Sequence, residues 1–353
     1  MISYDVARFG APLERVERPT PQPAGSEVLL KVLAAGVCHS DIHIRAGEYD
    51  LGGGKTLKMG ERGVTLPLTM GHETVGEVVA LGPKAQGVAL GDRRLVFPWI
   101  GCGACSVCAR GEENLCLKPR TLGVFAPGGF SDHIIVPHPR YLLEIGDLAP
   151  EHAAPYACSG LTSFSALRKI DPRVLEREPI MIIGAGGVGL MCLSLYRAMG
   201  GPRAIVVDID PKKRAVALQA GAHAVVDAGA PDAVKQVIDA AGGAIWAAID
   251  YVGANRTAQL GLDCLVKGGK LIVVGLFGGE IALSLPLIPL RAITIQGSYV
   301  GNLAELRDLM SLLRRTKVEP IPIACRALDQ AQATLVDLEH GRLIGRTVLQ
   351  PGF

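Results

Sequence analysis

A glycine-rich turn between an apolar segment and a helical segment constrains the fold of this chain most strongly. The segment IIGAGGVGLM carries Gly184, Gly186 and Gly189 as a GxGxxG motif after the apolar residues PIMII. The first glycine permits a tight turn, the second lets a pyrophosphate approach the backbone, and the third lets the helix pack close to the strand. Because phosphate binds favourably at a helix N-terminus, the motif predicts a dinucleotide-binding unit.

The pattern around this motif predicts an α/β fold with two domains. Six apolar segments alternate with helical stretches, which indicates a doubly wound parallel Rossmann sheet. The first 150 or so residues instead alternate short β-branched segments with Gly and Pro, as in EVLLKVLAAG and ETVGEVVALG, and predict a mostly β, barrel-like domain. After residue 299, a helix over LAELRDLMSLLRR and strands ending in GRTVLQ should return to that domain. We therefore expect one domain from residues 1–159 and 299–353, and a nucleotide-binding domain from residues 160–298.

Charge and composition narrow the class of ligand. The chain has a net charge of +2 and no cluster of Lys and Arg, so neither nucleic acid nor a membrane surface is predicted as a partner. No segment reaches the ~18 unbroken apolar residues of a spanning helix, and the N-terminus lacks the pattern of a signal peptide. We expect a cytoplasmic enzyme that acts on small molecules.

Four of the nine cysteines lie within fifteen residues, in GCGACSVCARGEENLC. Thiolates this close can surround one zinc ion and leave no open position for chemistry, which predicts a structural zinc site. Two local disulfides or four free thiols are the alternatives, and neither suits a reducing compartment and this spacing. Iron–sulfur clusters need similar spacing but are typical of redox carriers. The ligands of this site would be Cys102, Cys105, Cys108 and Cys116.

A second, dispersed set comprises Cys38 in GVCHSDIH, His72 and Glu73 in MGHETVG, and Cys158 in YACSGLTS. Two thiolates and one imidazole leave the fourth position of a tetrahedral zinc free for water or an alcohol oxygen. Taken singly, a buried cysteine or histidine is more often a packing residue. Their occurrence together with the four-cysteine loop favours a catalytic metal site.

The GHE and GVCHSD segments and the four-cysteine loop together resemble the zinc-containing medium-chain dehydrogenase/reductase family, specifically its alcohol dehydrogenases, over the whole chain. The resemblance implies a GroES-like catalytic domain, two zinc ions per chain, and Cys38, His72 and Cys158 as catalytic ligands with Glu73 close by. It implies that Asp41 accepts a hydrogen bond from His72. It also makes Ser40 and His43 a proton relay to solvent.

The cofactor is predicted to be NAD. Asp208 ends the next strand, 24 residues after Gly184, where a carboxylate can accept the adenosine ribose hydroxyls and would repel a 2′-phosphate. The resemblance assigns further cofactor contacts to residues around this motif and across the chain. They are His39, Thr162, Gly187, Val188, Lys213, Val274 and Arg346.

The substrate is predicted to be a primary or secondary alcohol or the matching aldehyde or ketone, in a pocket that includes Tyr49, Trp99 and Leu276. The 28 residues between His43 and His72 form a Gly-rich insertion that we expect to be a surface loop at the mouth of the cleft. A polyol or amino-alcohol dehydrogenase is the enzymatic alternative. A noncatalytic nucleotide-binding relative or a zinc-free quinone reductase would lack the zinc ligands.

The last strand of the sheet, AITIQGSYV, should pair with a second copy in a homodimer or homotetramer.

Overall fold

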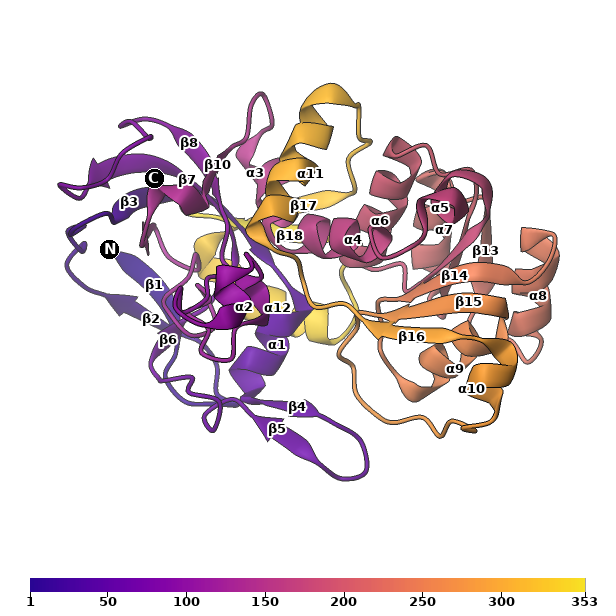
Figure 1. Ribbon diagram of the computed structural model, residues 1–353. Coiled ribbons are helices and arrows are strands. Elements are labelled where there is room, and N and C mark those ends of the chain that lie inside the picture. The colour runs from indigo at the N-terminus through magenta and orange to yellow at the C-terminus, as the bar shows by residue number, and fades with distance from the viewer. Residues whose placement is uncertain (353) are drawn as a thin grey trace.

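The computed structural model describes residues 1–352 and arranges them as two lobes (Figure 1). The second lobe contains a six-stranded sheet in the order β13-β12-β11-β14-β15-β16, and every neighbouring pair in it is parallel. Each predicted apolar strand is present, so the predicted Rossmann sheet is confirmed. The strands are β11 (Ile180–Ile183), β12 (Ala204–Asp208), β13 (Ala224–Asp227), β14 (Ile245–Asp250), β15 (Leu265–Val273) and β16 (Thr294–Gly297).

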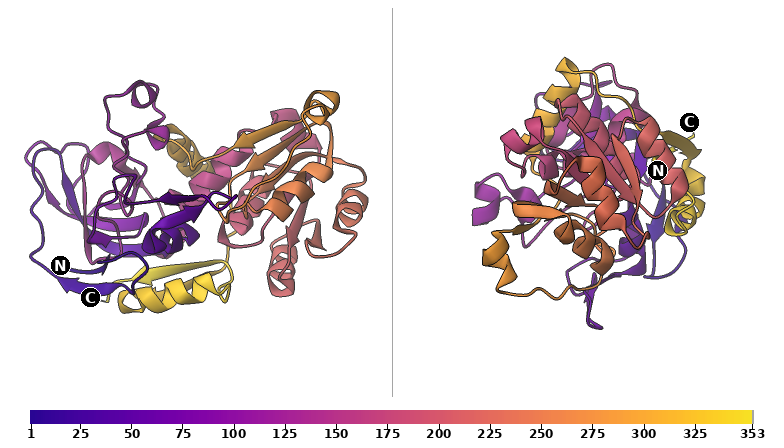
Figure 2. Two further views of the ribbon diagram at one scale, coloured as in Figure 1. Left: turned by 90° about the horizontal axis from the view of Figure 1, so that it is seen from below. Right: turned by 90° about the vertical axis from the view of Figure 1, so that its right-hand side faces the viewer.

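Helices cover both faces of this sheet (Figure 2). All four residues of β11 are buried, as expected for a central parallel strand between two helical layers. Because parallel strands present their carboxyl ends at one edge, the turns after β11, β12, β14 and β15 meet there and face the first lobe. The helices of this lobe are α5 (Pro172–Arg177), α6 (Gly187–Ala198), α7 (Pro211–Gln219), α8 (Ala233–Ala241), α9 (Asn255–Asp263) and α10 (Leu287–Arg291).

The first lobe is built on a seven-stranded sheet in the order β10-β8-β7-β3-β18-β17, with β9 also paired to β3. A three-stranded sheet, β2-β1-β6, packs beside it. This is the predicted mostly β region. Its strands are β1 (Ile2–Val6), β2 (Glu14–Glu17), β3 (Val28–Val37), β6 (Leu68–Thr69), β7 (Glu73–Leu81), β8 (Arg93–Val96), β9 (His133–Val136), β10 (Leu142–Glu144), β17 (Ile323–Ala327) and β18 (Arg346–Gln350).

The C-terminal segment returns to the first lobe after crossing from the second. Helix α11 (Leu303–Arg315) covers the predicted LAELRDLMSLLRR stretch, and Asn302 caps it by accepting from the backbone of Glu305. Strand β18 then pairs antiparallel with β3, placing Thr347 opposite Val37. This pairing brings Arg346 beside the start of the first lobe's helix α1 (His39–Ala46).

Buried helix α4 (Ser159–Leu167) joins the lobes, and every one of its residues is buried. It packs against α6 and α11, and the Ser163 hydroxyl donates to the carbonyl of Val188 at 3.0 Å. The glycine turn at the start of α6 is thereby attached to a helix whose N-cap is Cys158. The remaining helices are α2 (Ser106–Ala109), α3 (Pro150–Ala153) and α12 (Ala331–Glu339).

The insertion between His43 and His72 contains a β-hairpin, where a surface loop was predicted. Strands β4 (Glu48–Asp50) and β5 (Thr56–Lys58) pair antiparallel, with Tyr49 opposite Leu57. Glycines with positive φ at positions 52–54 make the turn that the glycine-rich sequence permits. The hairpin projects from the first lobe toward the second (Figure 1).

Within residues 1–352, no helix has the length and apolar character needed to cross a lipid bilayer.

Candidate active site

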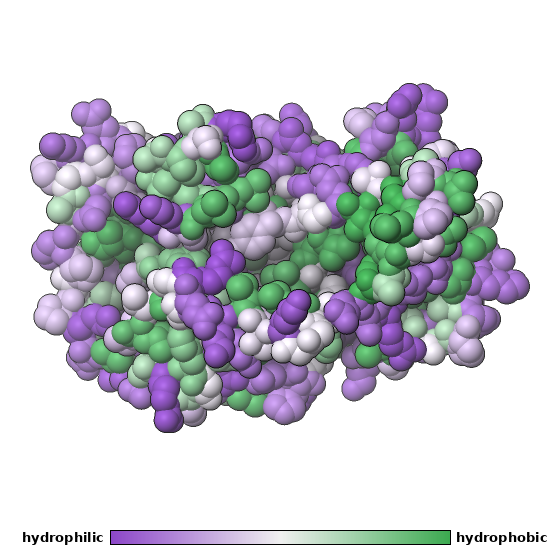
Figure 3. Space-filling view, turned by 60° about the horizontal axis from the view of Figure 1, so that its bottom comes forward, coloured by the Kyte–Doolittle hydropathy of each residue, from purple (hydrophilic) through white to green (hydrophobic). Residues whose placement is uncertain are grey.

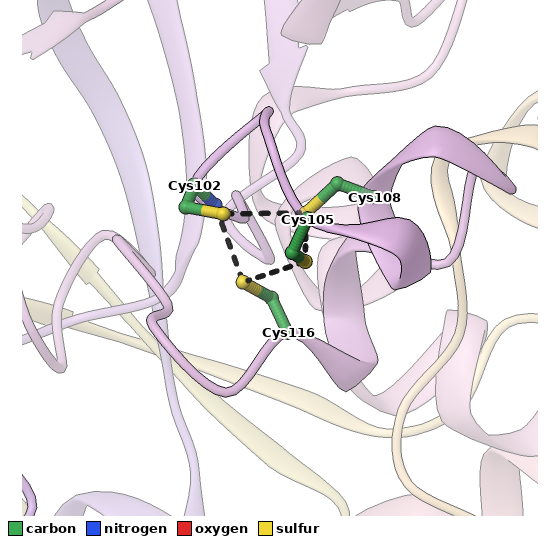
Figure 4. Close-up of side chains that lie close together, drawn as sticks. All are labelled: Cys102, Cys105, Cys108 and Cys116. Atoms are coloured by element: carbon green, nitrogen blue, oxygen red, sulfur yellow. Dashed lines mark hydrogen bonds between the residues drawn. The ribbon is translucent and has the colours of Figure 1, made fainter.

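The four clustered cysteines converge around one point, as Figure 4 shows. The Sγ atom of Cys105 lies 3.5 Å from the Sγ atom of Cys108 and 3.8 Å from that of Cys116. The Sγ atoms of Cys102 and Cys108 are 4.0 Å apart. Disulfide bonds are about 2.05 Å long, so the thiols are not bridged. Four sulfurs at Zn–S distances of about 2.3 Å would lie nearly this far apart in a tetrahedron. The geometry therefore fits one fully enclosed metal ion.

A buried carboxylate attaches the loop that carries the four cysteines to the rest of the first lobe. Glu113 accepts from the Gly101 backbone at 3.1 Å, from the Tyr141 hydroxyl at 2.8 Å and from Arg140 at 2.7 Å. The side chain of Asn114 donates to the carbonyl of Tyr299 at 3.0 Å. The cysteine loop is thus fixed both to the turn just before β10 and to the segment that follows β16.

The dispersed residues also meet. Ligand atoms of Cys38, His72, Glu73 and Cys158 all lie within 4.8 Å of one another, and all four side chains are buried. Cys38 follows β3, His72 precedes β7, and these strands pair so that Gly36 lies opposite Glu73. The register of one strand pair therefore brings three of them together, and the start of α4 adds Cys158.

The chemistry of these side chains fits a zinc ion. The Sγ atoms of Cys38 and Cys158 are 3.9 Å apart, close to the separation of two thiolates on one zinc. Neither ring nitrogen of His72 has a hydrogen-bond partner among the described residues, although Nδ1 lies 3.2 Å from Asp41. A buried imidazole with an unpartnered nitrogen is costly unless a ligand completes it. A metal ion would supply that partner.

The two thiols shift each other's proton affinity. Hydrogen bonding to Cys158 holds the pKa of Cys38 well below its usual range, and Arg346 and His72 reinforce this. The same hydrogen bond, with burial, raises the pKa of Cys158. One thiol is therefore ionised before the other, and a dication is needed for both to be thiolates at neutral pH.

Glu73 links the metal-ligand cluster to the nucleotide turn through a buried ion pair. Its two carboxylate oxygens accept from Arg346, with Nε donating at 3.1 Å and the second contact made by Nη2. Gly36 makes room for this carboxylate, since a Cβ there would lie 2.0 Å from Oε2 of Glu73. Arg346 also lies beside Gly187, where an added Cβ would be 3.1 Å from the arginine Cδ. Gly36 was not predicted from the sequence, because nothing in its neighbouring residues marks this position.

The glycine motif has the geometry that its sequence predicts. Gly184 has φ +95°, and a Cβ on Gly189 would lie 1.7 Å from the Gly184 carbonyl oxygen. At Gly186 an added Cβ would meet nothing within 4 Å, so the backbone there borders open space at the first turn of α6. Gly184 and Gly189 thus close the turn, and Gly186 leaves space at the helix N-terminus.

Asp208 stands at the end of β12 beside this turn. Its oxygens accept from the backbone of Ala185 at 2.7 Å and of Asp210 at 2.8 Å. Each carboxylate oxygen keeps a further lone pair for a ligand hydroxyl. Arg214, the nearby cation in α7, donates to the Asp208 carbonyl at 2.8 Å and pairs with Asp227 at 3.2 Å.

The other predicted cofactor residues surround the same edge of the sheet. His39 is exposed at the start of α1, Lys213 and Val274 are half-buried, and Thr162 is buried in α4. Val188 lies in the first turn of α6.

The predicted relay residues adjoin an aromatic group. Ser40 is half-buried and hydrogen bonds to the side chain of Tyr49, whose ring stacks on His43 with 4.6 Å between centroids. Burial is the largest influence on His43 and lowers its pKa. On the other side, the Trp99 ring lies 5.3 Å from that of His72, and its Nε1 donates to the Ala157 carbonyl at 2.9 Å.

Tyr299 was not predicted from the sequence. Its ring lies edge-on to the ring of Trp99, with 6.2 Å between centroids. The next residue in the chain, Val300, has a φ of 43°. A β-branched residue with positive φ is a conformational outlier and marks a fixed backbone. Leu276 follows β15 and is largely exposed, 46% of its surface being accessible. The aromatic side chains thus line one side of the metal-ligand cluster.

Comparison with known proteins agrees with this site. Residues 24–147 match the alcohol dehydrogenase GroES-like domain and residues 187–315 the zinc-binding dehydrogenase domain. The chain is 37% identical to an NAD-dependent alcohol dehydrogenase of Sulfurisphaera tokodaii, over 99% of this chain and 100% of the relative. It is 31% identical to a D-arabinose 1-dehydrogenase (NADP(+)) of Saccharolobus solfataricus, over 98% of this chain and 96% of the relative.

Among solved structures, the alcohol dehydrogenase of Aeropyrum pernix superposes with a TM-score of 0.89 at 29% identity, covering 99% of this chain and 100% of that one. The chain belongs to the zinc-containing medium-chain dehydrogenase/reductase family, among its alcohol dehydrogenases.

Proposed function

We propose that this protein is a zinc-dependent alcohol dehydrogenase that reversibly oxidises primary or secondary alcohols to aldehydes or ketones with NAD. The convergence of two thiols, an imidazole and a carboxylate within 4.8 Å carries this proposal. An arginine connects that cluster to the glycine turn of a Rossmann sheet. A metal site and a dinucleotide site that share one ion pair suit hydride transfer between alcohol and nicotinamide.

When bound, zinc would polarise the alcohol oxygen and lower the pKa of its hydroxyl, and NAD would accept the hydride. Cys38, His72 and Cys158 would hold the zinc, and Asp41 would fix the orientation of His72 from 3.2 Å. Ser40 and His43 would carry the hydroxyl proton to solvent, since the buried ligands cannot exchange it directly.

NAD is favoured over NADP by the charges near Asp208. The carboxylate would accept the ribose hydroxyls and repel a 2′-phosphate. Arg214 is engaged by Asp227 and by a backbone carbonyl, so it is not available to neutralise a phosphate. Glu73 engages Nε and Nη2 of Arg346, whereas Nη1 lies beside Gly187, 3.4 Å from an added Cβ there, and would donate to the pyrophosphate.

Metal analysis joined to an activity assay tests this function. We expect two zinc ions per chain in the wild type, and a single ion with no turnover in Cys38→Ala, because only the dispersed site loses a ligand. The matched control is Cys325→Ala, an exposed cysteine on β17, which should keep both ions and full turnover. A Cys38→Ala protein that retains two zinc ions and oxidises alcohols would refute the proposal. A screen of alcohols, polyols and amino alcohols with NAD and NADP would define the substrate.

We further propose that residues 1–159 with 299–353 form the catalytic domain and residues 160–298 the cofactor domain of a cytoplasmic homodimer or homotetramer. Strand β16 supports the assembly, because it ends the sheet, and within residues 1–352 no strand pairs with its outer side. Apolar surface gathers on the lobe that carries it (Figure 3), including Ile295, Leu285 and Leu290. Ile295→Lys should reduce the mass measured by light scattering, and an unchanged mass would argue against this interface.

A further inference from the structure

The hairpin of β4 and β5 covers the imidazole of His43 with an aromatic ring. The planes of His43 and Tyr49 are inclined by only 24°, with 4.6 Å between ring centroids. His39 approaches the same imidazole edge-on at 5.6 Å. Nε2 of His43 is buried and has no hydrogen-bond partner within residues 1–352. The ring is therefore held by stacking, while one nitrogen stays without a protein partner.

The hairpin cannot easily move Tyr49 away from His43, because both its ends are packed. At the base, Gly47 ends α1 with φ +84°, and a Cβ there would lie 2.5 Å from the ring of Phe9. At the tip, a Cβ on Gly52 would lie 2.8 Å from the backbone of Gly279.

The loop after β15 packs against the tip just as closely. A Cβ on Gly278 would lie 2.8 Å from the Cβ of Asp50, the residue after Tyr49. Because Gly52 and Gly278 carry no side chain at these two points, the first lobe's hairpin rests directly on the second lobe. The position of Tyr49 is therefore set by contacts with both lobes.

We propose that Tyr49 is a positioning residue of the proton relay, whose ring orients His43 and stabilises its imidazolium form. The inference rests on the proposed function. The proton leaves the alcohol hydroxyl, passes by way of Ser40 to a ring nitrogen of His43 and goes on to water, so no other reactant is consumed. While His43 carries this proton, the π face of Tyr49 attracts its positive charge.

The charges around His43 make such stabilisation useful. Burial lowers the pKa of His43 most, and His39 lowers it further, whereas the Cys38 thiolate and the backbone of Glu48 raise it. On α12, Glu339 pairs with Arg45 at 2.8 Å, so its charge is already neutralised. Burial lowers the pKa of the adjoining His39 most, and Arg346 and Lys213, across the site, lower it further. Burial disfavours the protonated form of His43, and the π face of Tyr49 favours that form and so counteracts the effect of burial.

Two substitutions separate the ring from its hydroxyl. Tyr49→Phe keeps the stacked face and loses the hydrogen bond to Ser40, whereas Tyr49→Leu keeps an apolar cover and loses the π face. The first readout is the NMR titration of the His43 imidazole, assigned by its disappearance in His43→Gln. The second is the pH dependence of kcat for alcohol oxidation, with and without added imidazole.

We expect the pKa of His43 to be unchanged in Tyr49→Phe and to fall by at least about half a unit in Tyr49→Leu, because an exposed cation–π contact corresponds to about half a unit and a desolvated one is stronger. The pH profile of Tyr49→Leu should shift in the same direction, and imidazole should restore part of its turnover. Leu51→Ala is the control, because Leu51 lies on the same hairpin, has no aromatic ring and leaves 52% of its surface accessible.

A wild-type titration of His43 in Tyr49→Leu, or an equal shift in Tyr49→Phe, would overturn the proposal. The titration is independent of turnover. If the wild-type protein oxidised no alcohol, the proposed function would fall while the stacking measurement would still report on Tyr49.

Discussion

Alanine should mainly lower stability at one glycine of the turn, Gly189, and mainly lower cofactor affinity at another, Gly186. At Gly189 an added Cβ would lie 1.7 Å from the carbonyl oxygen of Gly184, about half of an ordinary contact distance of ~3.5 Å. Helix α6 would have to move away from β11, at a cost of about 1–3 kcal/mol or more in the free energy of unfolding. At Gly186 nothing lies within 4 Å and φ is −75°, which any residue adopts. Gly186→Ala should therefore lose less than about 1 kcal/mol, as expected for a weaker helix cap.

The variant that loses the most cofactor affinity should not be the one that loses the most stability. Because the new methyl group of Gly186→Ala fills the space at the N-terminus of α6, we expect the Kd for NADH to rise at least tenfold, or about 1.4 kcal/mol. Denaturant unfolding measures the stability of both variants, and quenching or enhancement of NADH fluorescence measures binding. The reasoning fails if Gly186→Ala binds NADH like the wild type, or if Gly189→Ala is as stable as the wild type.

Three further predictions concern the charges and the metal sites. Asp208→Ala should raise kcat/KM with NADP relative to NAD, because the repulsion of a 2′-phosphate is removed; an unchanged ratio would reject its ribose role. Glu113→Ala should lower the free energy of unfolding by about 1–3 kcal/mol, because the Tyr141 hydroxyl and Gly101 N–H lose a buried acceptor. Denaturant unfolding would reveal this, and wild-type stability would contradict it. Zinc at the dispersed site should dissociate more readily as pH falls, because hydrogen bonding to Cys38 raises the pKa of Cys158 and protons compete with metal for that thiol. Equilibrium dialysis over a pH series, followed by metal analysis, would show an affinity independent of pH if this is wrong.

The sequence by itself determined those features whose physical cause lies within a short segment. The glycine motif is recognisable because a strand, a tight turn and a helix follow one another within ten residues, and Gly184 and Gly189 meet in the structure as that order requires. The four-cysteine loop is likewise local, and its thiols lie 3.5–4.0 Å apart in the pairs Cys105–Cys108 and Cys102–Cys108. The six strands of the Rossmann sheet could be predicted because short apolar segments alternate with helical stretches along the chain.

Only the tertiary structure decided the contacts between distant segments. Glu73 and Arg346 are 273 positions apart, and the pairing of β3 with β7 and β18 joins them. The need for Gly36 follows from the same register, and the stack of Tyr49 on His43 depends on a hairpin that the glycine-rich insertion did not by itself specify. Strand register and lobe packing are set by the summed burial of many side chains, so no short segment encodes them.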